Sequence, residues 1–170
     1  MFTSSTIWTV PFGINNVLVS LAGGGSSGGT GPSASFGGSS GGFLQEIPIS
    51  VTPGEAIVIT IGQGGAGGGP QLSGNPGGNS SFGSYLQCTG GAAGSFSTVY
   101  PGAAGSCTNV PGYGQGFGSI GSAVLTNSFS VGGVSPISNG YGSGGMTASW
   151  GNGAQQYAWS AMQGVVIVEY

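Results

Sequence analysis

The 170-residue sequence contains no Lys, Arg, His or Asp, and its acidic side chains are limited to Glu46, Glu55 and Glu169. A chain without cations has no side chain to displace counterions from a phosphate backbone, so conventional nucleic-acid binding is excluded. Because His and Lys are missing, no side-chain base of the usual kind is present to activate a serine or cysteine nucleophile. The surface must act through backbone amides, hydroxyls and aromatic rings, and we expect a structural or recognition protein rather than an enzyme.

The same absences argue against metals and cofactors. The chain offers only two thiols as ligands for zinc or iron, and three dispersed glutamates do not make a strong calcium site. Gly23, Gly25 and Gly28 have the spacing of a dinucleotide fingerprint. The residues that follow, TGPSASFGGSSGG, cannot form the helix whose N-terminus would face a pyrophosphate. We therefore expect no cofactor.

Signals for export and membrane insertion are also missing. The N-terminal residues MFTSSTIWTV have no basic region, and the apolar run VLVSLA is too short for a signal peptide or a membrane span. We expect a protein that is made in a cytoplasm, carries no secretion signal and does not insert into a membrane. Its two cysteines, Cys88 and Cys107, either form a disulfide or remain free, with Cys88 then a small apolar core residue.

Glycine is the most abundant feature that is present, at 41 residues. Each Gly costs roughly 0.5–1 kcal/mol more to order than Ala, so dense backbone hydrogen bonding, subunit association or both are expected as compensation. Disorder of the whole chain is the competing interpretation. The apolar residues, 38% of the chain, gather in strand-like runs, and the net charge is only −3, which favours a folded domain.

A hairpin is the clearest local prediction. Residues Phe43–Val51 and Ala56–Gly62 alternate between apolar and polar, which places Phe43 and Ile47 on the same face. The intervening Thr52-Pro53-Gly54-Glu55 carries Pro and Gly at the two central positions of a turn. The two segments are therefore expected to pair with each other around this turn.

The same hairpin separates two of the three carboxylates. Glu46 and Glu55 would lie about 20 Å apart along it, too far for a glycosidase pair. Either residue could still meet Glu169 across a sheet. Solvent-facing glutamates on strands are the simpler interpretation.

The whole chain is predicted to be one all-β domain, residues 1–170, built as an antiparallel sandwich. Its strands come from residues 1–22, 43–62, 80–89 and 164–170, with both ends in one sheet system. Long Gly-rich loops connect the strands, and one weaker strand is expected at Ala123–Val131; the loops are residues 23–42, 63–79 and 90–163. Two structures are open for these loops: packed polyproline II segments, which Gly permits in collagen, or irregular chain.

Aromatic rings in the Gly-rich sequence are the candidates for binding. Rings displayed on loops give rigid contact area to sugars or protein partners at low entropic cost. The alternative is that the same rings fill gaps between Gly segments as a dispersed core. The candidates are Tyr100, Tyr113, Phe117, Tyr141, Trp150 and Tyr157.

The order of sequence features resembles a known family. VPFG is followed by NNVLVSLAGGG, VTPGEAIVITIGQGGAGGG, GNPGGNSSFG and a closing GVVIVEY. In this order they resemble the glycine-rich domains of tail fibres and other virion proteins of tailed bacteriophages. The match is best at residues 6–25, 43–69, 74–83 and 164–170, whereas residues 95–160 match only in composition. The chain departs from the family in having no basic residue and no Asp, which removes conventional anchoring ion pairs.

The resemblance implies a jelly-roll-like sandwich with Gly-rich excursions at one end. It also implies a non-enzymatic virion component, a tail fibre tip or spike whose aromatic rings contact a glycan or protein of the host surface. Expected partners are other virion proteins and further copies of the chain, with a trimer favoured. The competing hypothesis is a purely architectural protein without a receptor role, such as a capsid decoration or a shell or filament subunit.

Overall fold

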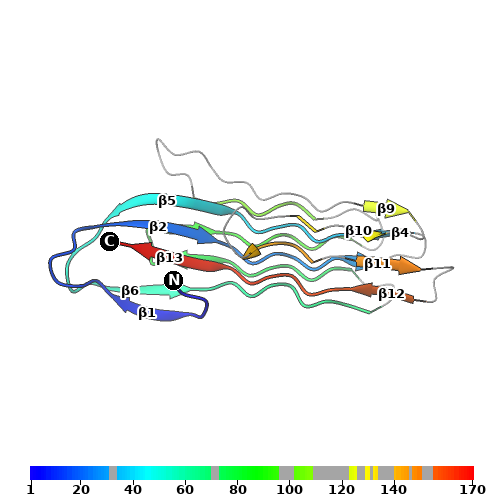
Figure 1. Cartoon of the computed structure of the whole chain (residues 1–170), viewed down its shortest axis with the longest axis horizontal. Coiled ribbons are helices and arrows are strands. Elements are labelled where there is room, and N and C mark those ends of the chain that lie inside the picture. Colours follow the sequence, from blue (N-terminus) through cyan, green and yellow to red (C-terminus); the bar gives the residue numbers. More distant parts are fainter. Residues whose placement is uncertain are drawn as a thin grey trace.

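The structure, a computed structural model, is an elongated all-β molecule with both chain termini toward one end (Figure 1). Extended segments run lengthwise from that end to short strands at the other. The described residues contain no α-helix, and so no helix among them is long and apolar enough to cross a membrane. The structure describes residues 1–30, 34–69, 73–95, 102–108, 123–125, 129–130, 132–133, 140–145, 147–150 and 155–170.

Two antiparallel sheets face each other at the end that holds the termini (Figure 1). One sheet has the order β13 (Val165–Glu169), β2 (Asn16–Ala22), β5 (Phe43–Ser50). The other has the order β1 (Thr6–Thr9), β6 (Ala56–Thr60), β7 (Ser80–Phe82), β8 (Leu86–Cys88). Because β13 pairs with β2, the prediction that the two ends of the chain share a sheet is confirmed.

The core between these sheets follows the predicted alternation. In β2 and β6 every second side chain is buried, while the intervening Leu18 and Val58 face outward. Burial of these branched side chains supplies the main hydrophobic stabilisation of this end. The largest contributors from the two strands and their neighbour β7 are Val17, Val19, Leu21, Ile57, Ile59 and Phe82.

The predicted hairpin is wrong in its pairing, although its turn is present. Gly54 has a φ of 81°, and the N–H of Glu55 donates to the carbonyl of Thr52 at 3.0 Å. The strands on either side of the turn nevertheless lie in different sheets, since β5 pairs with β2 and β6 pairs with β1. Each strand buries one apolar face in the same core, from a different sheet, instead of pairing with the other strand. A turn signal fixes the reversal of the chain but not whether the strands pair or stack.

A β-bulge in β5 changes which residue enters the core. Glu46 has a φ of 50°, and its N–H donates to the Ser20 hydroxyl at 2.9 Å, at the point where the register with β2 shifts. A bulge inserts one residue and so reverses the faces of the strand beyond it. Leu44 therefore enters the core beside Ile47, whereas Phe43, predicted to share the face of Ile47, packs at the margin.

Two further strand predictions are corrected by the structure. Residues 80–89 form two short strands, β7 and β8, because Gly83 adopts a φ of 53° and the chain reverses between them. The predicted strand Ala123–Val131 is likewise two short strands, β9 (Ala123–Leu125) and β10 (Phe129–Ser130), which belong to different sheets. In both cases strand propensity identified the region but gave too long an element.

The Gly-rich residues between the two ends are held by backbone hydrogen bonds between segments. Residues 23–27 donate five consecutive N–H groups, at 2.8–3.0 Å, to three neighbouring segments, and every third donor returns to the same neighbour. Their carbonyl acceptors belong, in chain order, to Gly42, Gly78, Met162, Ser39 and Asn75. A repeat of three residues without internal hydrogen bonds is the geometry of a polyproline II helix.

Three further neighbours bind the carbonyl groups of the same segment. The carbonyls of Gly24, Gly25 and Ser26 accept from the N–H groups of Gly91, Gly65 and Gly145, respectively, at 2.8–2.9 Å. The segment 23–28 is therefore surrounded by six others and is completely buried. We call this arrangement the glycine array.

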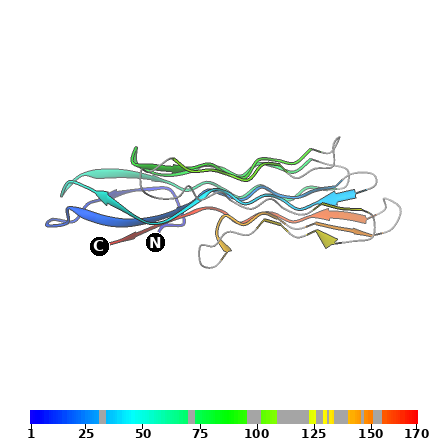
Figure 2. The ribbon, with the colours of Figure 1, turned by 90° about the horizontal axis from the view of Figure 1, so that it is seen from above.

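The glycine array consists of three layers of three segments among the described residues (Figure 2). The middle layer contains residues 37–42, 23–28 and 62–68, the second layer residues 102–106, 89–92 and 74–78, and the third residues 132–133, 140–145 and 158–164. Of the two structures that the sequence left open for the Gly-rich stretches, the described residues show packed segments with polyproline II periodicity. They are not irregular loops.

Glycine is required in the centre of the array because the backbones approach closely. A Cβ added to Gly23, Gly24 or Gly25 would overlap a backbone carbonyl of the neighbouring segment, and the three carbonyls belong to Thr89, Gln63 and Ser143. The three successive Cα atoms thus face three different segments. The side chains that do occur inside the array are small hydroxyls with backbone partners, such as Ser27, whose Oγ accepts from the N–H of Asn75 at 2.8 Å.

Two small three-stranded sheets lie at the end of the array opposite the termini (Figure 1). One has the order β3 (Gly29–Thr30), β4 (Ala34–Phe36), β9. The other has the order β10, β11 (Thr147–Trp150), β12 (Gln155–Ala158). We call these six strands the distal strands. They continue directly from array segments, since β3 follows residues 23–28 and β12 leads into residues 158–164.

Adding one methyl group at the centre of the array is expected to destabilise the protein. Gly24→Ala places a Cβ against the carbonyl of Gln63, and six surrounding segments prevent the backbone from moving away. Overpacking of this kind costs about 1–3 kcal/mol. In a thermal melt the variant should unfold several degrees below the wild-type protein. Ala66→Ser is the matched control, because it also adds one heavy atom but at an exposed array position. Equal melting temperatures for Gly24→Ala and wild type would contradict the close packing.

Candidate functional site

The six predicted contact rings fall into three groups. Tyr100, Tyr113 and Phe117 lie outside the described residues. Trp150 and Tyr157 belong to the distal strands, where Trp150 pairs with Gln155 and Tyr157 with Ala148. Tyr141 lies in an array segment close to the sandwich.

Trp150 and Tyr157 are held far from the chain termini. Their strands, β11 and β12, form an antiparallel pair at the end of the molecule opposite the termini (Figure 1). The second distal sheet supports this pair, because β11 and β12 contact β3 and β4. Both residues are therefore carried by a hydrogen-bonded backbone and not by an isolated loop.

Tyr141 has a different setting. It is partly buried and packs against the cluster formed by Ala22 and Val165, where the array joins the sandwich. This contact matches the core interpretation of the rings. Tyr141 also lines an open groove, so one side of the residue remains available.

The groove beside Tyr141 has a volume of about 420 Å³. Three array segments form it, and its lining combines one ring, one thioether, two amide side chains and backbone. Its lining residues are Gln63, Gly64, Tyr141, Ala161, Met162 and Gln163. Only Tyr141 was predicted as a contact residue from the sequence, because the other lining residues come from segments far apart in the chain and carry no motif.

The glutamates occupy separate places. Glu46 lies at the bulge of β5, and Glu169, in β13, lies opposite Leu18 of β2. Glu55 belongs to the turn that leads into β6 of the other sheet. Among the described residues, no group of three Cys or acidic side chains is placed to hold a metal ion.

Glu55 forms a well-defined polar side-chain cluster at the sandwich. Its carboxylate accepts the Tyr85 hydroxyl at 2.9 and 3.0 Å, and Oε2 also accepts the N–H of Thr52 at 3.2 Å. The hydrogen bond to Glu55 raises the pKa of Tyr85 above 10, and burial and the negative charge of Glu55 act in the same direction. Glu55 and Tyr85 line a shallow pocket of about 320 Å³ together with Ser81 and Ser84. The pair therefore links the 52–55 turn to the β7–β8 hairpin.

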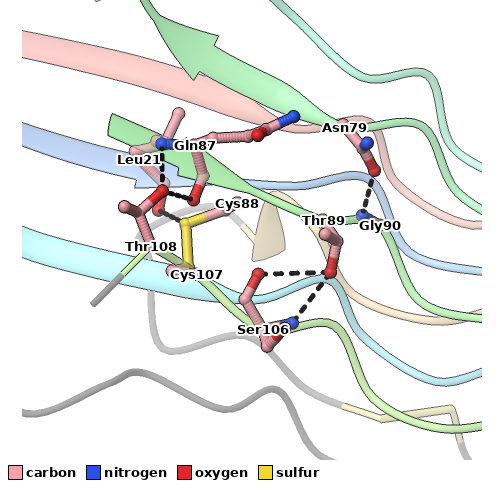
Figure 3. Close-up of a disulfide and its surroundings, with 9 residues drawn as sticks. All are labelled: Leu21, Asn79, Gln87, Cys88, Thr89, Gly90, Ser106, Cys107 and Thr108. Carbon is pink, nitrogen blue, oxygen red and sulfur yellow. Dashed lines mark hydrogen bonds between the residues drawn. A yellow bond between two sulfur atoms is a disulfide. The ribbon is translucent and has the colours of Figure 1, made fainter. Parts of the chain in front are cut away.

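The two cysteines form a disulfide, which resolves the alternative that the sequence left open (Figure 3). Their Cα atoms are 4.0 Å apart, and Cys88 is also fully buried in the sandwich core. Backbone hydrogen bonds flank the bridge on both sides, from Thr89 to Ser106 at 2.7 Å and from Thr108 to Gln87 at 2.8 Å. The bridge thus joins β8 to the edge of the array.

Removing the Tyr85 hydroxyl is expected to destabilise the protein in a pH-dependent way. Tyr85→Phe loses the hydrogen bonds to Glu55, which should cost about 1 kcal/mol at neutral pH. Because the folded-state pKa of Tyr85 is raised, the wild-type advantage is fully present below about pH 10 and declines as pH rises through the folded-state pKa. Urea unfolding of both proteins between pH 7 and 11 measures this difference. A constant difference over the whole range would contradict the assignment.

The chain belongs to a family of glycine-rich domains, whose family model matches residues 2–167. None of the curated proteins compared with the chain is a significant match to it.

Proposed function

We propose that this protein is a non-enzymatic surface component of a bacteriophage virion, a tail fibre tip or spike. In this proposal the sandwich end attaches to other virion proteins and the distal strands contact the host surface. The proposal rests on the sequence resemblance to virion glycine-rich domains. It also rests on the separation of the distal strands from the chain termini by the glycine array (Figure 1).

That separation is the observation that carries the proposal. Apart from the groove beside Tyr141 and the neighbouring Trp159, the array contributes little surface chemistry, since it has exposed small uncharged residues such as Ala66, Ala92 and Ala103. What it provides is a rigid spacer whose far end holds two aromatic residues, Trp150 and Tyr157. A spacer that holds rings away from the attachment end suits a protein that must reach a second surface.

The surface of the sandwich end has features that support the proposed assembly with other proteins. Ile7 and Val58 pair across β1 and β6 and are 65% and 55% exposed, and Phe12 in the adjoining turn is 94% exposed. Large apolar side chains gathered on one surface are typical of a protein contact. β1 is also an edge strand without Pro or charge, the usual features that block edge pairing. These features fit a homo-oligomer, with a trimer favoured, docked on other virion proteins.

The same features also support the competing function, an architectural subunit without a receptor role. In that case the sandwich surface would drive ordered polymerisation, and the distal strands would have no partner on the host. Binding of purified protein to host cells distinguishes the two hypotheses. Polymers that form without any host binding would favour the architectural function.

Substitution of the distal rings is expected to weaken attachment to host cells. Loss of an aromatic anchor typically costs 2 kcal/mol or more, about thirtyfold in affinity. Trp150→Ala and Tyr157→Ala should each bind host cells at least thirtyfold more weakly while keeping the wild-type circular dichroism spectrum. Tyr170→Ala is the matched control, since it removes an exposed ring at the opposite end.

Attachment by both distal variants at the wild-type level would contradict the proposed host contact. An equal loss caused by Tyr170→Ala would also contradict it, because the contact would then not be confined to the distal strands.

A further inference from the structure

The groove beside Tyr141 has the properties of a preformed binding site. Its backbone is fixed on all sides: Gly62 and Gly65 accept hydrogen bonds from Gly164 and Ala161 at 2.8 and 2.9 Å. No side chain could be added at Gly64, because a Cβ there would overlap the carbonyl of Ala161. The floor of the groove is therefore rigid, and a ligand would cost little in ordering of the protein.

The groove side chains are also held in place. Tyr141 packs against Ala22 and Val165, so only part of its side chain is available to the groove. The Gln163 side chain donates through Nε2 to the carbonyl of Thr3 at 3.0 Å, which leaves its amide oxygen as an acceptor. The Gln63 amide makes no side-chain hydrogen bond in the described structure and is exposed, so it offers both donors and an acceptor.

An apolar ridge extends from the groove. Met162 is 46% exposed, and its backbone is locked by a hydrogen bond from its N–H to Ser143 and another from the N–H of Gly25. Trp159, also 46% exposed, lies three residues earlier in the same array segment. One polyproline II turn separates the two, about 9 Å along the segment. A ligand longer than the groove would continue along this ridge.

The absence of charge limits the ligand class. The groove lining contains no Glu, and the three glutamates of the chain lie in the sandwich or its turn. A charged ligand would lose hydration without gaining a counter-charge. A ring and a thioether provide apolar contact, and two amides provide directional hydrogen bonds to hydroxyl groups.

We infer that this groove is a binding site for a neutral saccharide. In that complex the Tyr141 ring and Met162 contact the apolar face of one sugar, and Gln63 and Gln163 bind its hydroxyls. The inference goes beyond the proposed function: Tyr141 is one of the predicted contact rings, but the site lies where the array joins the sandwich and not at the distal strands. Its test therefore uses purified protein and sugars, without host cells.

The experiment titrates the isotope-labelled protein with oligosaccharides and follows its amide signals by NMR. The probes are neutral trisaccharides of glucose, galactose, mannose, N-acetylglucosamine and fucose, with sialyllactose as the charged comparison. At least one neutral probe should shift the signals of Gln63, Gly64 and Met162, and sialyllactose should leave them unchanged.

Variants then locate the site. Gln63→Ala should weaken binding of the neutral probe at least tenfold, and its exposed position should leave folding intact. Gln87→Ala is the matched control, since Gln87 is an exposed glutamine on β8 outside the groove. Tyr141→Ala should abolish binding. If this variant melts at the wild-type temperature, the loss is that of a ligand contact, whereas a lowered melting temperature indicates a damaged fold.

Three results with the sugar probes would overturn the inference. They are no shift with any neutral probe, shifts that map away from the groove, and equal binding by Gln63→Ala and wild type. Stronger binding of a proline-rich peptide than of every sugar at the same signals would also overturn it in favour of a protein partner. Failure here would leave the distal-ring hypothesis intact, whereas normal host attachment by Trp150→Ala and Tyr157→Ala would leave the groove inference intact.

Discussion

Close approach of backbones in the glycine array is the constraint on which the rest of the structure depends. Segment 23–28 donates and accepts hydrogen bonds with six neighbours, and a Cβ at Gly23, Gly24 or Gly25 would overlap one of them. The unusual composition follows from this constraint. Residues without a side chain allow each backbone group to reach a partner, so the array is held by many peptide hydrogen bonds, whereas the main apolar core lies in the sandwich. The ordering cost of the glycines is offset in the same way, within one chain.

The array also determines where chemistry can occur. Its segments carry few large side chains, so recognition is left to the two ends and to the groove beside Tyr141. The sandwich has the exposed apolar residues Ile7, Phe12 and Val58, the distal strands carry Trp150 and Tyr157, and the groove collects Tyr141 with two amides. The disulfide between Cys88 and Cys107 fixes the array to the sandwich at its edge. A rigid spacer with separated contact surfaces is the mechanical basis of the proposed role in a virion.

The sequence was sufficient for the elements that carry an apolar pattern and insufficient for those that do not. Alternation located β2 and β6 and their buried faces correctly, and the apolar run GVVIVEY located β13. It placed β5 and β6 in a hairpin, because the Pro53-Gly54 turn is equally compatible with strands that pair and strands that stack across a core. Nothing in the sequence around Glu46 predicts the bulge that brings Leu44 into the core. Glycine spacing could not separate polyproline II segments from loops, since Gly has no side chain whose period could be read. The groove could not be predicted from the sequence, because Gln63, Tyr141 and Met162 come together only in the folded chain.

Amide hydrogen exchange measured by NMR tests the central claim most directly. If the glycine array is an ordered, hydrogen-bonded body, the N–H groups of Gly24, Gly25, Gly65 and Gly91 should exchange as slowly as that of Val19 in the centre of β2. Protection of the array would then require opening of the whole domain. Exchange of these glycine amides at the rate of an unstructured chain, with Val19 still protected, would contradict the account and return the Gly-rich residues to the status of loops.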